Sequence, residues 1–217
     1  ACEENNIPRF LQMSSLNADA VNGKSHYLKT KGEAEDLLHA NNSGIHVTSF
    51  RPSIIFGAQD SFFNRFASLL KMTPLFFPLA CAGSKFAPVS VDNVTEMMVR
   101  SLNDPNSYGK RYQLCGPNVY TLKELVQYTA NECRLKRLII PLNDILSRIQ
   151  AAIFDFVPGK PFSTDNYLSA KTDSVCECND LSVYDIKPTT IESTVPQYLS
   201  NYSYRSRYMQ LRSTSRR

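Results

Sequence analysis

Apolar positions along the chain switch between an alternating pattern and a helical spacing, which marks successive strands and helices. Five short apolar or alternating runs predict strands, at residues 7–14, 45–50, 86–91, 111–114 and 138–141. Between them, apolar residues recur at helical spacing in residues 27–39, 62–70, 93–102, 122–133 and 142–157. An alternation of strand and helix is typical of an α/β fold with a parallel sheet.

Polar residues at the starts of these helices predict how they begin. Thr121 with Glu124 forms a capping box, in which each side chain bonds the other residue's backbone N–H. Asn93 with Glu96 fits the same arrangement, so Asn93 is predicted to open its helix. Asp60 and Ser61 are expected to cap the helix that follows them.

The segment 142–157 has an apolar stripe whose surroundings the sequence leaves open. A helix packed on the body of the protein is the prediction, because the polar positions Asp144, Arg148 and Asp155 are not strongly basic. A helix lying on a membrane surface is the alternative. The stripe consists of Leu142, Ile145, Leu146, Ile149, Ala152, Ile153 and Phe156.

Composition narrows the class of protein. The chain has 217 residues, of which 42% are hydrophobic, with 12 Phe and 11 Tyr, so a packed core is expected and a disordered chain is excluded. No stretch approaches the roughly 18–20 apolar residues of a membrane-spanning helix. The net charge is +4, and residues 202–217 carry five Arg and no acid, which leaves −1 for the rest. This predicts a near-neutral domain with a basic tail, and not a nucleic-acid-binding face.

The cysteines show no C-x-x-C pair and no spacing suited to a metal, so no metal site is expected. They are predicted to be reduced thiols in a cytosol-like compartment. The six are Cys2, Cys81, Cys115, Cys133, Cys176 and Cys178.

The sharpest chemical feature is Tyr27 followed four residues later by Lys31. In a helix the two side chains lie one turn apart on the same face. A lysine ammonium near a phenol favours the phenolate, and such a tyrosine can exchange a proton with a carbonyl or an alcohol. Ser15 follows the preceding strand, where its hydroxyl can orient the same substrate oxygen. Arg51 could pair locally or contact a phosphate.

Several segments together resemble one protein family. Ser15, Tyr27, Lys31 and the sequence R-P-S-I-I-F-G at residues 51–57 are similar to the second half of the nucleotide-binding domain of extended short-chain dehydrogenases/reductases, the NAD-dependent epimerase/dehydratase type. Further segments resemble the branch that holds the nicotinamide-nucleotide-binding accessory subunit of respiratory complex I, its bacterial relatives and proteins linked to ubiquinone biosynthesis. These segments are D-S-F-F-N-R-F at 60–66, K-F-A-P-V-S-V at 85–91, Y-Q-L-C-G-P-N-V-Y-T at 112–121, P-G-K-P-F-S-T-D-N-Y at 158–167 and V-P-Q-Y-L at 195–199.

The resemblance implies a role for each matching residue. Tyr27 would be the acid/base, Lys31 its activator and a ligand of the cofactor ribose, and Ser15 the orienting hydroxyl. Pro52 and Ser53 would line the nicotinamide end of NADP or NAD. The accessory subunits hold a nucleotide without turnover, so these residues permit catalysis without requiring it.

One feature of the family is absent from this sequence. No G-x-x-G-x-x-G turn, which would bind the pyrophosphate, occurs in it. We therefore expect a fragment that begins just before the fifth strand of a Rossmann-type domain and binds dinucleotide weakly or not at all. A degenerate member of the family is the alternative. The expected organisation is the second half of that domain at 1–74, a smaller α/β substrate or partner domain at 75–199, and the basic tail at 200–217.

The implied function is that of an NAD(P)-binding carbonyl/alcohol oxidoreductase linked to respiratory or quinone metabolism. The alternatives are a non-catalytic subunit that holds the nucleotide in a complex I-like assembly, and a sugar-nucleotide epimerase or dehydratase. The expected partners are a small substrate or a respiratory protein assembly, with peripheral membrane contact possible through the tail. The expected location is the cytoplasm or the surface of the inner membrane, on the matrix side in a mitochondrion.

Overall fold

A computed structural model describes residues 4–40, 44–157 and 162–199. Its elements follow one another in the order β1 (Arg9–Met13), α1 (His26–His39), β2 (His46–Pro52), β3 (Ile55–Phe56), α2 (Phe63–Met72), β4 (Phe76–Leu79), β5 (Lys85–Phe86), β6 (Val89–Ser90), α3 (Val91–Ser101), η1 (Pro105–Ser107), β7 (Arg111–Leu114), β8 (Tyr120–Thr121), α4 (Leu122–Glu132), β9 (Leu138–Pro141), α5 (Asp144–Phe154), α6 (Thr164–Ala170), η2 (Asp180–Tyr184) and α7 (Ile191–Leu199).

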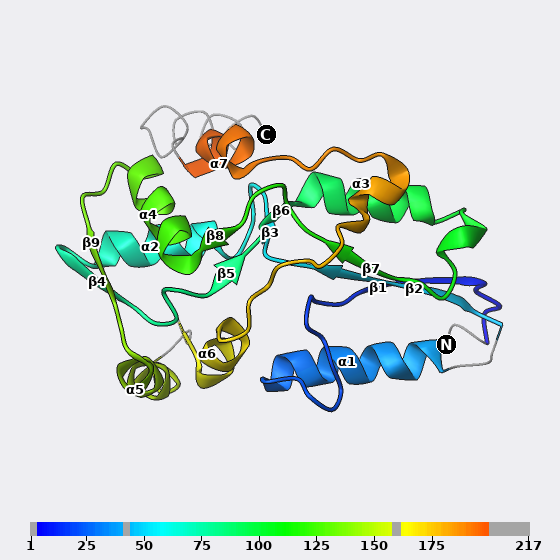
Figure 1. The fold of residues 1–217 in the computed structure, drawn as a ribbon, viewed down its shortest axis with the longest axis horizontal. Coiled ribbons are helices and arrows are strands. Elements are labelled where there is room, and N and C mark those ends of the chain that lie inside the picture. Colours follow the sequence, from blue (N-terminus) through cyan, green and yellow to red (C-terminus); the bar gives the residue numbers. More distant parts are fainter. Residues whose placement is uncertain (1–3, 41–43, 158–161, 200–217) are drawn as a thin grey trace, which may run out of the picture.

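The central sheet is parallel, in the strand order β1-β2-β7. Helix α1 lies on one face of it and α3 on the other, as Figure 1 shows. On the α3 side, a cluster around Phe50, Met97 and Leu114 is fully buried. The predicted α/β class with a parallel sheet is confirmed, and the strand predicted at 86–91 is instead divided between β5 and β6.

A second core joins α2, α4 and α7 to the parallel pair β4–β9. Phe63 of α2, Leu125 of α4 and Val195 of α7 are fully buried in it. In Figure 1 these elements lie to the left of the central sheet. The domain division at residue 74 stays a prediction, and the basic tail at 200–217 lies outside the described residues.

The predicted helix starts are right at α4 and wrong at α3. The Thr121–Glu124 capping box is present in both directions. Helix α3 is instead capped by Ser90, whose hydroxyl accepts from the Asp92 N–H. Asn93 is buried in the first turn, where its side chain bonds the backbone of Lys187 and Thr189. Its amide is needed there to hold a distant segment, which the local sequence does not indicate.

Helix α5 also departs from the prediction. Its apolar stripe does not pack on the body of the protein, because Ile145, Ile149 and Ile153 are exposed. The residues that α5 buries are the small Ser147 and Ala151. Small side chains let α5 approach α6 closely while the bulky residues point away from the contact.

The prediction of reduced thiols is wrong for two of the cysteines. Cys115 and Cys176 form a disulfide across 61 residues, with their Cα atoms 6.0 Å apart. Cys115 follows the end of β7, and the segment after α6 returns to that point. Only the tertiary fold brings the two together, so their sequence spacing gave no sign of it. Cys81, Cys133 and Cys178 are free, and Cys178 is exposed.

Alkylation of the unfolded and folded protein tests this cysteine pattern. Iodoacetamide at about pH 8, near the reference thiol pKa, should modify Cys178 first. Burial raises the pKa of the Cys81 thiol to about 11, so this residue should react slowly. Cys115 and Cys176 should react only after reduction and unfolding. Peptide mass spectrometry gives the readout, and rapid labelling of Cys115 without a reductant would contradict the disulfide.

No helix in the described ranges is long and apolar enough to cross a membrane.

Candidate functional site

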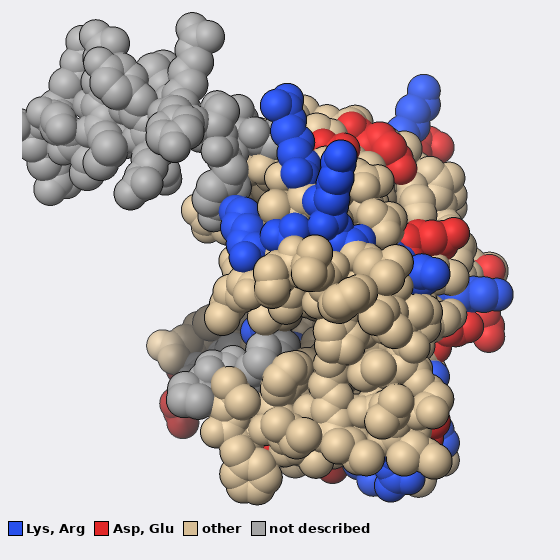
Figure 2. Space-filling view, turned by 90° about the vertical axis from the view of Figure 1, so that its left-hand side faces the viewer, with Lys and Arg blue, Asp and Glu red and all other residues tan. Residues whose placement is uncertain are grey.

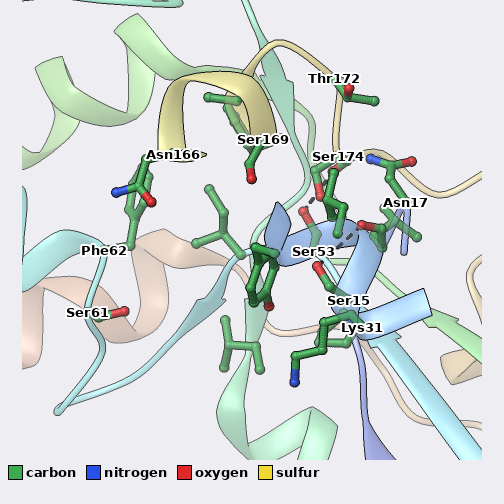
Figure 3. A pocket seen from close by; sticks show the side chains of 18 of the residues that line it. Ser15, Asn17, Lys31, Ser53, Ser61, Phe62, Asn166, Ser169, Thr172 and Ser174 are labelled. Atoms are coloured by element: carbon green, nitrogen blue, oxygen red, sulfur yellow. Dashed lines mark hydrogen bonds between the residues drawn. The ribbon is translucent and has the colours of Figure 1, made fainter. Parts of the chain in front are cut away.

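A cavity of about 570 Å³ opens at the carboxyl ends of β1 and β2. Every predicted site residue lines it: Ser15, Tyr27, Lys31, Pro52 and Ser53. Figure 3 shows Ser15, Lys31 and Ser53 around the same hollow. The carboxyl ends of parallel strands meet at one edge of a sheet, where α/β proteins bind their ligands. The structure therefore brings these five residues together, while their chemical roles stay a prediction.

Helix α1 presents Tyr27 and Lys31 to the cavity from its first two turns. Two sets of hydrogen bonds, one from Ser25 and one from Asp165, fix the start of α1. The Ser25 hydroxyl accepts from the Leu28 N–H at 3.1 Å. The Asp165 carboxylate accepts from the backbone N–H groups of His26 and Tyr27, at 2.6 and 3.2 Å. A carboxylate at a helix N-terminus is favoured by the helix dipole, so α6 and α1 are held together beside Tyr27.

Because Gly32 has no side chain, the loop that carries Asp19 and Ala20 can pass close to α1. A Cβ atom at Gly32 would lie 2.3 Å from the backbone nitrogen of Ala20. The loop that carries Asp19 and Ala20 therefore lies directly against the turn of α1 that holds Lys31. A larger residue at Gly32 would displace either the loop or the helix.

The Lys31 ammonium is held near the Tyr27 ring. Its Nζ donates to the Met13 carbonyl at 2.9 Å and lies 5.9 Å from the centroid of the ring. The Met13 carbonyl is at the end of β1, so the strand fixes where the charge sits. Tyr27 is about half-exposed and can reach a ligand. A fixed cation beside an accessible phenol can support proton transfer to a substrate oxygen.

Two serine hydroxyls follow β1, and only that of Ser15 was predicted to belong to the site. The Ser15 hydroxyl donates to the Leu16 carbonyl at 3.3 Å. Ser14 also lines the cavity, is buried, and its hydroxyl has no hydrogen-bond partner within the described part of the chain. The Ser14 hydroxyl has almost no accessible surface, whereas Ser15 is partly exposed, so Ser15 is the serine that a ligand in the cavity can reach. The sequence signal was the pair of adjacent serines, which does not say which of them faces the cavity.

Pro52 and Ser53 form the wall next to β2. The Ser53 hydroxyl donates to the Ser174 carbonyl at 2.7 Å, and its backbone N–H donates to Leu114. The first bond holds the segment after α6 over the end of the sheet, and the second holds Ser53 against β7. Ser53 therefore shapes the cavity while its hydroxyl is already bonded to the protein.

Arg51 does not reach the cavity. Its guanidinium pairs with the fully buried carboxylate of Glu35, from Nε at 2.9 and 3.0 Å and from Nη2 at 2.5 Å. Arg111 of β7 contacts the same carboxylate at 3.1 Å. This ion pair holds α1 against the sheet behind the site. Of the two possibilities left open for Arg51, pairing within the protein is therefore the one observed.

The far wall of the cavity comes from α2 and α6, which the sequence analysis did not assign to a site. Phe62 and Arg65 contribute from the start of α2, and Asn166 and Ser169 from α6. The Ser169 hydroxyl donates to the Ser25 hydroxyl at 2.7 Å, which closes α6 onto α1. Asn166 and Ser169 lie more than a hundred positions from Tyr27 in the sequence, and Phe62 and Arg65 lie more than thirty. No local motif therefore joins them to it.

The residues present fit one end of a nicotinamide nucleotide. Ser15 offers a partly exposed hydroxyl, Lys31 a cation, and Pro52 a flat apolar surface in one hollow. The glycine-rich turn for the pyrophosphate is absent from this sequence. The fit therefore covers the nicotinamide and ribose end alone.

Comparison with known families decides the relationship. Residues 2–128 match the model of the 3-beta hydroxysteroid dehydrogenase/isomerase family. The chain belongs to this family. Membership agrees with the predicted class of extended short-chain dehydrogenases/reductases and with the Rossmann-type fold.

Relatives of this family member include subunits of a respiratory enzyme. The mitochondrial NADH dehydrogenase [ubiquinone] 1 alpha subcomplex subunit 9 of Arabidopsis thaliana is 30% identical over 93% of the chain and 50% of the relative. The counterpart in Mus musculus is 31% identical over 76% of the chain and 43% of the relative. The chain thus spans about half the length of the curated relatives it matches.

Solved structures confirm the fold of this family member. The NADPH-dependent quinone oxidoreductase QOR2 of Escherichia coli, in complex with NADPH, superposes with a TM-score of 0.67 at 16% identity, over 92% of the chain and 67% of that chain. At such identity the likeness shows the fold alone.

Proposed function

We propose that the full-length protein containing this chain is an NAD(P)-dependent oxidoreductase that acts on a carbonyl or alcohol group. The observation that carries the proposal is the convergence of Tyr27, Lys31, Pro52 and two serines on one cavity at the carboxyl ends of β1 and β2. Membership of a dehydrogenase family supports it. A bound nicotinamide would supply or accept the hydride.

The chain's own residues would carry the proton chemistry. The Tyr27 hydroxyl donates a proton to the carbonyl oxygen as it becomes an alcohol, and accepts it in the reverse direction. Lys31, fixed by the Met13 carbonyl, stabilises the phenolate that remains. A serine hydroxyl orients the same oxygen. Ser15 is the residue predicted for this role, and its partial exposure at the cavity supports it over the buried Ser14.

Turnover by the full-length protein tests the proposal. The loss of NADPH or NADH absorbance would be followed with a panel of ketones, aldehydes and quinones. We expect turnover with one coenzyme, and Ser15→Ala should lower the rate more than Ser14→Ala, because Ser15 is the more exposed of the two. Nucleotide bound with no turnover on any acceptor would contradict the oxidoreductase assignment.

A second candidate is a subunit that holds the nucleotide and catalyses nothing. It is supported by relatives named as mitochondrial NADH dehydrogenase subunits. The partner would then be a respiratory assembly, on the matrix side of the inner membrane. Co-migration with NADH dehydrogenase on native gels, together with bound nucleotide and no turnover, would favour this candidate. The sugar-nucleotide epimerase alternative has only the fold of its neighbours in support.

A further inference from the structure

Helix α5 presents its apolar side to solvent. Ile145 is 69% exposed and Ile153 is 58% exposed, and Ile149 and Phe156 continue the same stripe at helical spacing. The opposite side carries the buried residues Ser147 and Ala151. Amphipathic helices in globular proteins bury the apolar side, so α5 has the reverse orientation.

Polar contacts on the inner side fix that orientation. The Asp144 carboxylate accepts from the Tyr167 hydroxyl and pairs with the Lys171 ammonium at 2.9 Å. These two contacts hold the pKa of Asp144 below its usual value, so it is ionised at neutral pH. The Gln150 amide donates to the Pro78 carbonyl at 3.1 Å. Turning the helix to bury its isoleucines would break all three contacts.

The neighbouring strand pair is also apolar on its outer side. Phe76 lies opposite Leu138, and Pro78 lies opposite Ile140, in the parallel register of β4 and β9. All four side chains are exposed, whereas Phe77 and Ile139 between them are buried. Parallel strands are normally covered on both faces, so an exposed apolar side on this pair is unusual.

These two elements form one continuous surface, because β9 runs into α5 after two residues and Gln150 bonds β4. We name it the outer apolar face. Contiguous exposed apolar areas of this extent mark interaction sites. The outer apolar face consists of Phe76, Pro78, Leu138, Ile140, Ile145, Leu146, Ile149, Ala152, Ile153 and Phe156.

Basic side chains border the outer apolar face. Lys71 ends α2, and Arg134 and Lys136 precede β9; all three are exposed. The Arg137 Nε donates to the Leu70 carbonyl at 3.0 Å, which brings the two basic segments side by side. Figure 2 looks onto this side of the molecule, with Lys and Arg gathered above a broad area without charge. Arg148 adds a cation beside the stripe of α5.

From these observations we propose that the outer apolar face docks on an anionic lipid bilayer. Aliphatic side chains with a basic border are the signature of a surface that lies in the membrane interface. Each cation near an anionic leaflet adds attraction. Lysine is depleted at protein–protein interfaces, so the border of Lys71 and Lys136 favours lipid over a protein partner. The proposal rests on this surface and does not depend on catalysis at the cavity.

Vesicle co-sedimentation of the full-length protein tests it. The probes are phosphatidylcholine vesicles with and without about 30% phosphatidylglycerol, which supplies the negative surface potential. Binding is expected to the anionic vesicles, and it should weaken in about 0.5 M salt. Ile149→Ser with Ile153→Ser should lower the partition coefficient at least about tenfold, since two aliphatic side chains no longer leave water. Arg134→Glu with Lys136→Glu should weaken the preference for anionic vesicles.

A matched control replaces two exposed apolar residues elsewhere. Val99→Ser with Val183→Ser, from α3 and η2, should bind vesicles as the wild type does. Circular dichroism confirms that each variant is folded. Three results would overturn the proposal: equal binding by the Ile149/Ile153 variant, self-association through this face with no vesicle binding, or binding to a respiratory protein assembly that replaces vesicle binding.

Discussion

Replacing Tyr27 by Phe should lower the rate of carbonyl reduction by the full-length protein by about 10²–10⁴-fold. The change removes one hydroxyl from a half-exposed ring at the edge of the cavity, so the fold is retained. Nucleotide affinity should be nearly unchanged, because Lys31 keeps its bond to the Met13 carbonyl. Steady-state kinetics together with calorimetric binding separate these two effects.

Tyr108→Phe is the matched control. Tyr108 stacks on His46 at the start of β2, with ring centroids 4.0 Å apart, at the opposite end of the strand from the cavity. Its replacement should leave the rate at the wild-type level. An equal rate loss in both variants, or an unchanged rate in Tyr27→Phe, would show that Tyr27 is not the proton donor.

Replacing Glu35 by Gln should lower the free energy of unfolding by about 2–3 kcal/mol, because charge-assisted hydrogen bonds to two arginines are lost. Glu35 is fully buried, whereas the Arg51 and Arg111 side chains are 26% and 36% exposed. Water can therefore solvate the arginines in part. For this reason the loss of folding stability should be smaller than for a fully buried ion pair. Urea unfolding followed by circular dichroism measures it.

The exposed pair Glu96–Arg100, one turn apart on α3, provides the comparison. Glu96→Gln should change the free energy of unfolding by no more than about 0.5 kcal/mol. An equally small change in the free energy of unfolding for Glu35→Gln would show that the buried ion pair does not hold α1 to the sheet.

Site residues that are close together in the sequence, or that follow directly on a predicted strand, could be predicted from the sequence. Tyr27 and Lys31 are four residues apart in a segment rich in helix formers, so their shared face follows from helix geometry alone. Ser15 and Ser53 follow predicted strands, and parallel strands bring such positions to one edge. The alternation of strands and helices likewise predicted the α/β class.

Features that depend on tertiary contacts were not predictable. Asp165 caps α1 from 139 residues away, and Cys176 meets Cys115 across 61. The apolar stripe of α5 was predicted to pack on the protein because periodicity shows that a helix has an apolar side. It does not show whether that side faces the protein or the solvent. Asp144 and Gln150 decide that direction through partners in α6 and β4. Asn93 was mistaken for a cap because its true partners lie almost a hundred residues later.

Calorimetric titration of the full-length protein and its Lys31→Ala variant with NADPH and NADH shows whether this cavity holds the nicotinamide end of a nucleotide. We expect one of the two nucleotides to bind the wild type. In Lys31→Ala its dissociation constant should rise at least about tenfold, the loss of one charge-assisted hydrogen bond. Equal affinity in the two proteins, or no binding of either nucleotide to the wild type, would contradict the account.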